Sequence, residues 1–217
     1  MKKRKLNYSN ITISALSIIL VVLIVITGIL AYGIIKDTFG KKGEKEVEIV
    51  DNIGNYGYQL TENNTEYFKS LYYELKDVLN DEESESFDED YASLVARLFV
   101  ADFYDLNSKL NKTDIGGVQF VYTGYQGTFK DFASDINGIY YYVENNIYGD
   151  REQALPTVKD VSITEINNIS YTYKDINDAN AYQVKLYIEY TEDLGYPKYV
   201  TLVLVHSNNK IEVVKMN

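Results

Sequence analysis

Residues 11–35 read ITISALSIILVVLIVITGILAYGII and form a run of 25 residues without a charged side chain. A signal peptide has an apolar core of about 7 to 15 residues and a small-residue cleavage site, and the neighbours of Ala31 do not form that site. A helix of 25 residues is about 37 Å long and can cross a hydrocarbon layer of about 30 Å. The run from Ile11 to Ile35 therefore predicts a retained transmembrane helix, whose partner is the lipid bilayer.

The orientation of this helix follows from the sizes of the two parts of the chain on either side of it. Four basic residues precede the run and four follow it closely, so their count favours neither orientation. Long domains cross a membrane largely regardless of charge, whereas a short tail crowded with cations does not. We therefore expect a single-pass protein of the cell membrane, with residues 1–10 as a cytoplasmic tail and the C-terminal domain extracellular.

Composition excludes several classes of function for the outer part. The whole chain has a formal net charge of −11, and the part beyond residue 35 has 17 basic and 32 acidic residues. Such an acidic surface repels phosphate backbones, so we expect no nucleic-acid partner. The chain has no cysteine, which excludes disulfides and thiolate chemistry.

Tyrosine is abundant, with 22 tyrosines and no tryptophan. Aromatic faces stack on sugar rings, which allows a carbohydrate-binding interpretation. The alternative is nucleotide bias, because Lys, Asn, Ile and Tyr are abundant together, as in the AT-rich genomes of low-GC bacteria. We favour the second explanation.

Hydrophobic spacing divides the rest of the chain into a helical half and a strand half. Residues 36–57 mix glycine with charges and predict a stalk, in which a short strand at Val47–Val50 is compatible with the pattern. Residues 58–217 predict one α+β domain. Apolar residues at helical spacing predict a helix capped by Thr65, a second across residues 91–106 and a third across residues 129–143; a short strand is expected in DIGGVQFVY. From Thr157 onward the period falls to two residues, which predicts an antiparallel meander of four or more strands with a turn at SNNK. About three helices packed on one face of a curved sheet would bury both sets of apolar residues.

The segment DEESESFDED has seven acids in ten residues. A calcium loop needs acids at alternate positions, a glycine at the sixth and a bidentate glutamate at the twelfth, and this order is absent. We interpret the segment as a solvated connection whose last acids favour the N-terminus of the next helix. We therefore predict no metal site and no cofactor.

The order helix, helix, short strand, helix and four strands resembles the NTF2-like fold. With a basic tail, one membrane helix and a stalk before it, the layout resembles the VirB8-type proteins of bacterial conjugation and type IV secretion. KLNKTDIGGVQFVY and YYVENNIYGDR are also similar to blocks of membrane-anchored proteins of low-GC Gram-positive bacteria whose chemistry is unknown. The resemblance implies a non-enzymatic assembly part that contacts other subunits of a membrane complex.

Two residues are candidates for a binding site. Asp102 follows Leu98 and Phe99 on the apolar face of the second helix, so its carboxylate can point inward and act as a base, or can bond to a nearby backbone group or tyrosine hydroxyl. His206 is the only histidine and precedes the SNNK turn, a position typical of a partly exposed structural residue.

The sequence predicts a binding or assembly module that is not an enzyme. Motifs for nucleophilic serine hydrolases, P-loop proteins and zinc proteases are absent. The alternative is a small-molecule pocket of the NTF2-like type, with isomerase or dehydratase chemistry that uses Asp102.

Overall fold

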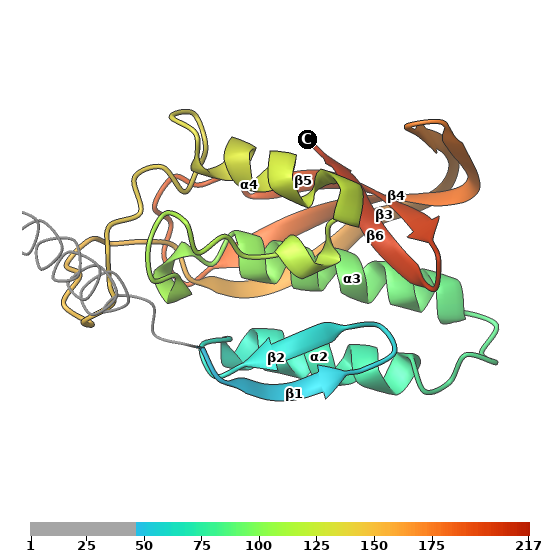
Figure 1. Cartoon of the computed structure of the whole chain (residues 1–217), viewed down its shortest axis with the longest axis horizontal. Coiled ribbons are helices and arrows are strands. Elements are labelled where there is room, and N and C mark those ends of the chain that lie inside the picture. Colours follow the sequence, from blue (N-terminus) through green and yellow to red (C-terminus); the bar gives the residue numbers. More distant parts are fainter. Residues whose placement is uncertain (1–46) are drawn as a thin grey trace, which may run out of the picture. The chain divides into compact units, whose positions relative to one another are not determined.

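The computed structural model describes residues 47–217, which form one compact unit (Figure 1). The predicted membrane helix, the basic tail and the first half of the predicted stalk, residues 36–46, lie outside the described residues. Within residues 47–217, no helix is both long and apolar enough to cross a membrane.

The described chain begins with a hairpin of two short antiparallel strands, β1 (Ile49–Ile53) and β2 (Tyr58–Thr61). The sequence assigned residues up to 57 to a stalk, but β1 belongs to the compact unit, which starts at Val47. The hairpin is held to the body by the buried rings of Tyr56 and Tyr58. Tyrosine burial, and not the charge pattern of the segment, therefore sets this end of the domain.

Two helices follow as the apolar spacing predicts. Helix α2 spans Glu66–Val78, and the Thr65 side chain accepts a hydrogen bond from the Phe68 N–H, as expected of an N-cap. Helix α3 spans Phe87–Phe103 and starts with Asp88, Glu89 and Asp90 in its first turn, where carboxylates favour the helix dipole. Helix α3 packs against α2 and against all four strands of the main sheet, so it is the centre of the domain.

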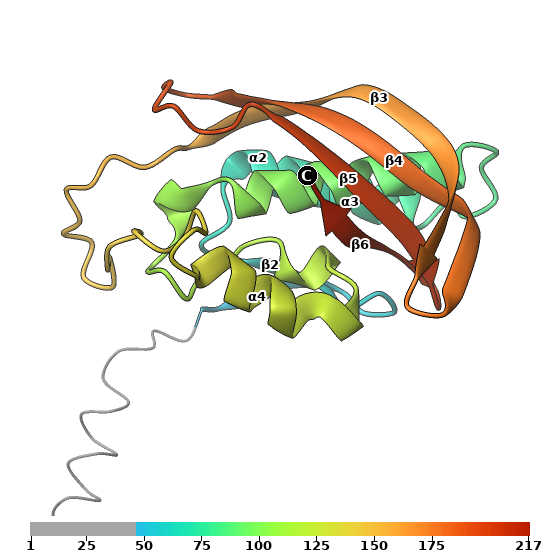
Figure 2. The same ribbon diagram turned by 90° about the horizontal axis from the view of Figure 1, so that it is seen from above.

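The main sheet is the predicted antiparallel meander, in the order β3-β4-β5-β6. Its strands are β3 (Val158–Tyr173), β4 (Ile176–Tyr190), β5 (Tyr199–Ser207) and β6 (Lys210–Met216), and the predicted turn joins the last two. Figure 2 shows the curved sheet arching over α3. The fold class predicted from the sequence, α+β with at least four antiparallel strands, is confirmed at this level.

The third helix is shorter than predicted. Helix α4 covers only Gln126–Ser134, because Asp135 leaves the helical conformation and the chain turns back at Gly138. The turn delivers Tyr140 to the core, where its hydroxyl donates to the Phe103 carbonyl and accepts from the Gly116 N–H. Helix α4 packs on α3 through the Phe129 ring, which lies 5.1 Å from the Phe103 ring.

The strand expected in DIGGVQFVY is replaced by a 3-10 turn, η2 (Val118–Phe120). Gly117 takes a left-handed conformation with φ 74°, and Phe120 is fully buried beside Tyr58. Only Val121 pairs with the sheet, through one parallel bridge to Val213. The local break at Gly117 therefore outweighs the strand propensity of the apolar residues after it.

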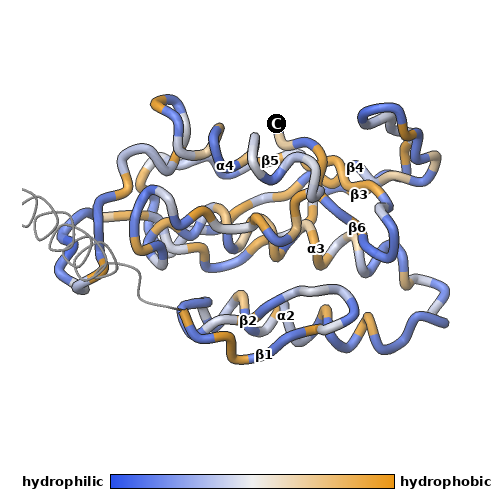
Figure 3. The backbone as a smooth tube through the Cα atoms, viewed as in Figure 1, coloured by the Kyte–Doolittle hydropathy of each residue, from blue (hydrophilic) through white to orange (hydrophobic). Residues whose placement is uncertain are grey.

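The space between helices and sheet is filled by side chains. Hydrophobic residues follow α3 and the strands, whereas the connection between α2 and α3 is mostly hydrophilic (Figure 3). The largest fully buried side chains are Tyr58, Tyr72, Tyr140, Phe68, Phe99, Phe103 and Phe120. The concave sites of the domain consequently lie at its rims.

Candidate functional site

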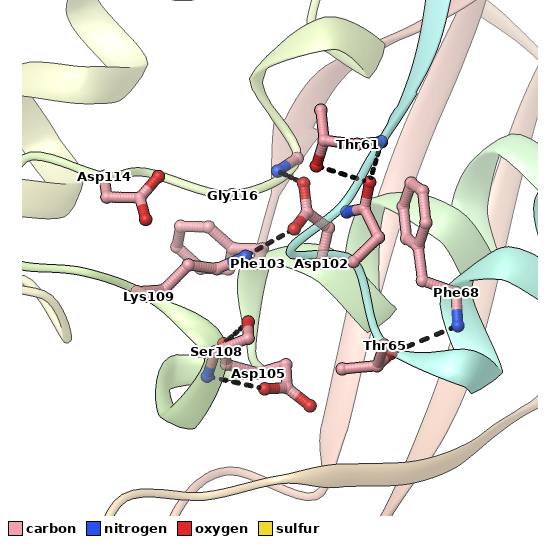
Figure 4. Close-up of polar contacts among 12 residues, drawn as sticks. Thr61, Thr65, Phe68, Asp102, Phe103, Asp105, Ser108, Lys109, Asp114 and Gly116 are labelled. Carbon is pink, nitrogen blue, oxygen red and sulfur yellow. Dashed lines mark hydrogen bonds and ion pairs between the residues drawn. The ribbon is translucent and has the colours of Figure 1, made fainter. Parts of the chain in front are cut away.

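Asp102 lies in the last turn of α3 and is engaged on both carboxylate oxygens (Figure 4). One oxygen is 2.5 Å from the Lys109 ammonium, and the other accepts a hydrogen bond of 2.6 Å from the Gly117 N–H. The two side chains are nearly buried, with 8% of Lys109 and 14% of Asp102 exposed. The geometry matches a structural ion pair at the edge of the apolar face.

The loop after α3 is brought onto the helix end by two glycines. A Cβ atom on Gly116 would lie 2.1 Å from the Asp102 carbonyl oxygen, so only glycine fits there. The left-handed Gly117 then points its N–H at the Asp102 carboxylate. The glycine pair that interrupts the expected strand therefore completes the environment of Asp102.

Electrostatics at this pair favour the charged state of the lysine. Burial lowers the pKa of Lys109, but the charge and hydrogen bond of Asp102 outweigh burial, so the pKa lies above its usual value. A pocket of about 270 Å³ adjoins the pair and is lined by β2 and the loop of residues 108–119. Among its polar lining groups are Asn63, Asn64, Asp114 and Gln119.

Asp105 is a buried acid that the sequence analysis did not single out. Its carboxylate caps the 3-10 turn η1 (Leu106–Ser108) by accepting from the Ser108 N–H, and it also accepts from the Val158 N–H at the start of β3. Burial raises the pKa of Asp105 despite these hydrogen bonds. A lone acid just after an apolar helix was the available signal, but its strand partner is 53 residues away.

His206 lies at the end of β5, partly exposed, as its place before the turn suggests. Its Nδ1 is 2.9 Å from the Asp178 carboxylate on β4, and its Nε2 is 3.2 Å from Asp88 in the first turn of α3. The backbone N–H of His206 also donates to Asp178. Burial raises the pKa of Asp178, but the hydrogen bonds from His206 and Asn180 outweigh it and hold this pKa below its usual value.

The two predicted residues belong to different sites. Asp88, which contacts His206, starts α3, and Asp102 ends it, so they are separated by about 21 Å along the helix axis. His206 lines a cavity of about 570 Å³ between three loops. The lining residues are Asn55, Tyr56, Glu82, Phe87, Asp88, Tyr91, His206, Asn208, Asn209, Lys210 and Ile211. We call this space the His206 cavity.

Glu212 is a second buried acid that the sequence analysis missed. It is 4% exposed and lies beside Thr123 and Ser207 at a smaller pocket of about 370 Å³. Burial raises its pKa, although the Ser207 hydroxyl, the charge of Lys210 and the Thr123 groups lower it. A single acid between the apolar Ile211 and Val213 was the only sequence signal.

An apolar groove separates α4 from β6. It has a volume of about 450 Å³, and its lining includes Phe99, Phe129, Phe132, Val214 and Met216. Phe132 is 61% exposed at its mouth.

Within residues 47–217, no three acidic or histidine side chains are arranged to hold a metal ion.

The comparisons with known proteins give no relative. No model of a protein family matches the chain, and neither a curated protein nor a solved structure matches it. Fold and site define the chain's described part as an α+β domain with a cavity of acidic, basic, amide and aromatic side chains near the start of its central helix.

Proposed function

We propose that the chain is a single-pass membrane protein whose residues 47–217 form an extracellular binding or assembly module without enzymatic activity. The uncharged run at residues 11–35 and the basic tail support the anchor. The order of helices and strands is compatible with an NTF2-like domain, and a VirB8-type role in a membrane complex is the finer form of the proposal. Other membrane subunits are the expected partners.

The His206 cavity carries the proposal. It is the largest of the concave spaces described above, and it combines polar and aromatic side chains, as ligand sites do. The general-base candidate from the sequence, Asp102, is held by Lys109 and Gly117 in a separate place. A binding module needs the His206 cavity and needs no reaction at Asp102, so it fits both observations.

A small-molecule site at Asp102 is the second candidate. It is favoured by the polar pocket of about 270 Å³ in which the Asp102–Lys109 pair forms part of the wall. A ligand there would meet a carboxylate and an ammonium at fixed positions. In this candidate the acid would act in isomerase or dehydratase chemistry.

The deciding experiment is mild crosslinking of the tagged full-length protein in its native membrane, followed by purification in detergent and identification of its companions. A defined set of membrane subunits is expected. Recovery of the chain alone would contradict the assembly role and direct the search to small molecules.

Asp102→Asn separates the two candidates. A module should keep its companions in this variant, once circular dichroism shows that the variant is folded. The opposite outcome is a variant that keeps its companions but loses turnover of a ligand that the unsubstituted protein converts. In that case the pocket is catalytic and the first proposal is wrong.

A further inference from the structure

The walls of the His206 cavity are joined by hydrogen bonds between segments that are distant in sequence. The Tyr56 hydroxyl, from the β1–β2 turn, donates a 2.7 Å hydrogen bond to Glu82 in the α2–α3 connection. The Asn209 side chain, from the β5–β6 turn, donates to the Asn55 carbonyl, and His206 contacts Asp88. Three loops that are distant in sequence therefore hold one another around a cavity that exists before any ligand arrives.

The charges of the lining are unbalanced. Glu82 and Asp88 contribute two carboxylates, and the segment that contains them has five further acids. The lining also has two basic side chains: Lys210, whose ammonium lies 4.8 Å from the centroid of the Tyr58 ring, and His206, whose Nε2 is 3.2 Å from Asp88. The seven acids of the segment outnumber these two groups, so the local charge disfavours an anionic ligand and favours a cation.

One aromatic ring of the lining is open to the cavity. Phe87 is partly exposed, whereas Tyr56 and Tyr91 are 8% and 2% exposed. These two rings pack beside Phe87, with 5.9 Å between the Phe87 and Tyr91 centroids and 5.8 Å between those of Tyr56 and Tyr91. A ring face attracts ammonium and guanidinium groups, and the apolar stem of such a ligand packs on the same ring. Carboxylates beside the exposed Phe87 ring are therefore an environment that favours an organic cation.

We infer that the His206 cavity binds an organic cation, an ammonium or guanidinium group on an apolar stem. This deepens the proposed binding module and rests on it. The cation is either a basic side chain of a partner protein or a free amine, since both present the same chemistry to Glu82, Asp88 and Phe87.

The test is a titration of the full-length protein in a nonionic maltoside detergent, followed by NMR shifts of backbone amides around the cavity. Detergents with choline head groups are avoided because they carry the cation chemistry under test. The probes are blocked lysine and blocked arginine, each Nα-acetylated with a methylamide terminus. Blocked norleucine is the control, because it keeps the apolar stem without the charge. Saturable shifts with the basic probes and none with norleucine are expected; equal responses, or no response to the basic probes, would overturn the inference.

Matched variants test the site itself. Glu82→Gln and Asp88→Asn should each weaken binding about three- to tenfold, and the amide introduced by Glu82→Gln can still accept from the Tyr56 hydroxyl. Glu83→Gln and Glu89→Gln remove equal charge from the same segment at positions outside the lining and should change affinity less than about twofold. Lys210→Met should tighten binding. Equal losses in both pairs would assign the effect to the general acidity of the segment and contradict a defined site.

The source of the cation is decided by a second pair of probes. Butylammonium presents the free amine, and a blocked Ala-Lys-Ala peptide presents the side chain in a chain context. Tighter binding of the peptide indicates a partner protein, and equal binding indicates a small amine. If the crosslinking experiment finds membrane subunits while no cation binds, this inference fails and the proposed module stands.

Discussion

At the scale of single residues, the Asp102–Lys109 pair shows how a sequence candidate changes meaning once its partner is known. The apolar spacing around Asp102 indicated an inward carboxylate, and the carboxylate does lie at the border of the core. Its partner, Lys109, comes from beyond the helix end, where periodicity carries no information. Because both side chains are mostly removed from water, each depends on the other for compensation.

Lys109→Met should reduce the free energy of unfolding by about 3–5 kcal/mol, since it leaves the Asp102 charge buried without its cation. Adding Asp102→Leu should restore part of this loss. Lys198→Met is the control, because the Lys198–Asp193 pair is more exposed and solvent screening leaves it a much smaller contribution to stability. Urea unfolding of the three variants and the unsubstituted protein measures these differences. Equal, small effects of Lys109→Met and Lys198→Met would show that the buried pair is not a structural element.

Asp178 makes a pH-dependent contribution to stability. Its folded pKa lies below the unfolded value, so its contribution is present above about pH 4 and is lost as the pH falls through the folded pKa. Asp178→Asn should therefore destabilise the protein by about 1–3 kcal/mol at neutral pH. The difference from the unsubstituted protein should shrink in acid.

Thermal unfolding across the acid range measures the effect of Asp178→Asn. Asp175→Asn, in the exposed β3–β4 turn, is the matched control and should change little at any pH. A difference that stays constant down to the lowest pH would mean that the Asp178 charge plays no part.

At the scale of secondary structure, the predicted boundaries agreed with the structure where the residues of the element itself decide where it begins and ends. Helix α2 has its cap, its apolar face and its end within one segment, and it was predicted closely. Helix α4 was predicted too long because its end is set by Tyr140, which bonds to the α3 end and to the loop before η2. The β1 strand lies in the segment assigned to a stalk, because residues 36–57 mix glycine with charges and lack a sustained period, although a short strand at Val47–Val50 was compatible with the pattern.

Two glycines near α4 test this account of its end. A Cβ atom on Gly138 would lie 2.1 Å from the Ala133 carbonyl oxygen, whereas one on Gly127 meets nothing within 4 Å. Gly138→Ala should therefore cost about 1–3 kcal/mol or more, and Gly127→Ala should stabilise by up to about 1 kcal/mol through helix propensity. Urea unfolding compares the two. A neutral Gly138→Ala would mean that the close turn is not required.

At the scale of the whole molecule, α3 organises the domain because it touches α2 and every strand of the main sheet. It also contributes to both candidate sites: Asp88, at its start, contacts His206, and Asp102 lies at its end. The two candidate sites therefore lie at opposite ends of one helix.

A chain of residues 47–217 should fold alone and unfold cooperatively, because its core is contained within this range. Fractionation should recover this shorter chain in the soluble fraction and the full-length chain in membranes. Circular dichroism with thermal unfolding tests the first outcome, and resistance of the full-length chain to an alkaline carbonate wash tests the second. A shorter chain without a cooperative transition would show that the first 46 residues contribute to the core.

The sequence by itself determined the α+β class, the first two helices and the four-strand meander, because periodicity is a local property of each segment. It also indicated the place of His206 at a strand end. Only the tertiary structure decided which side chains meet: Lys109 with Asp102, Asp178 and Asp88 with His206, and Glu82 with Tyr56. The reason is physical, since the partners in each contact come from different elements or loops, and which of these pack together depends on burial across the whole fold.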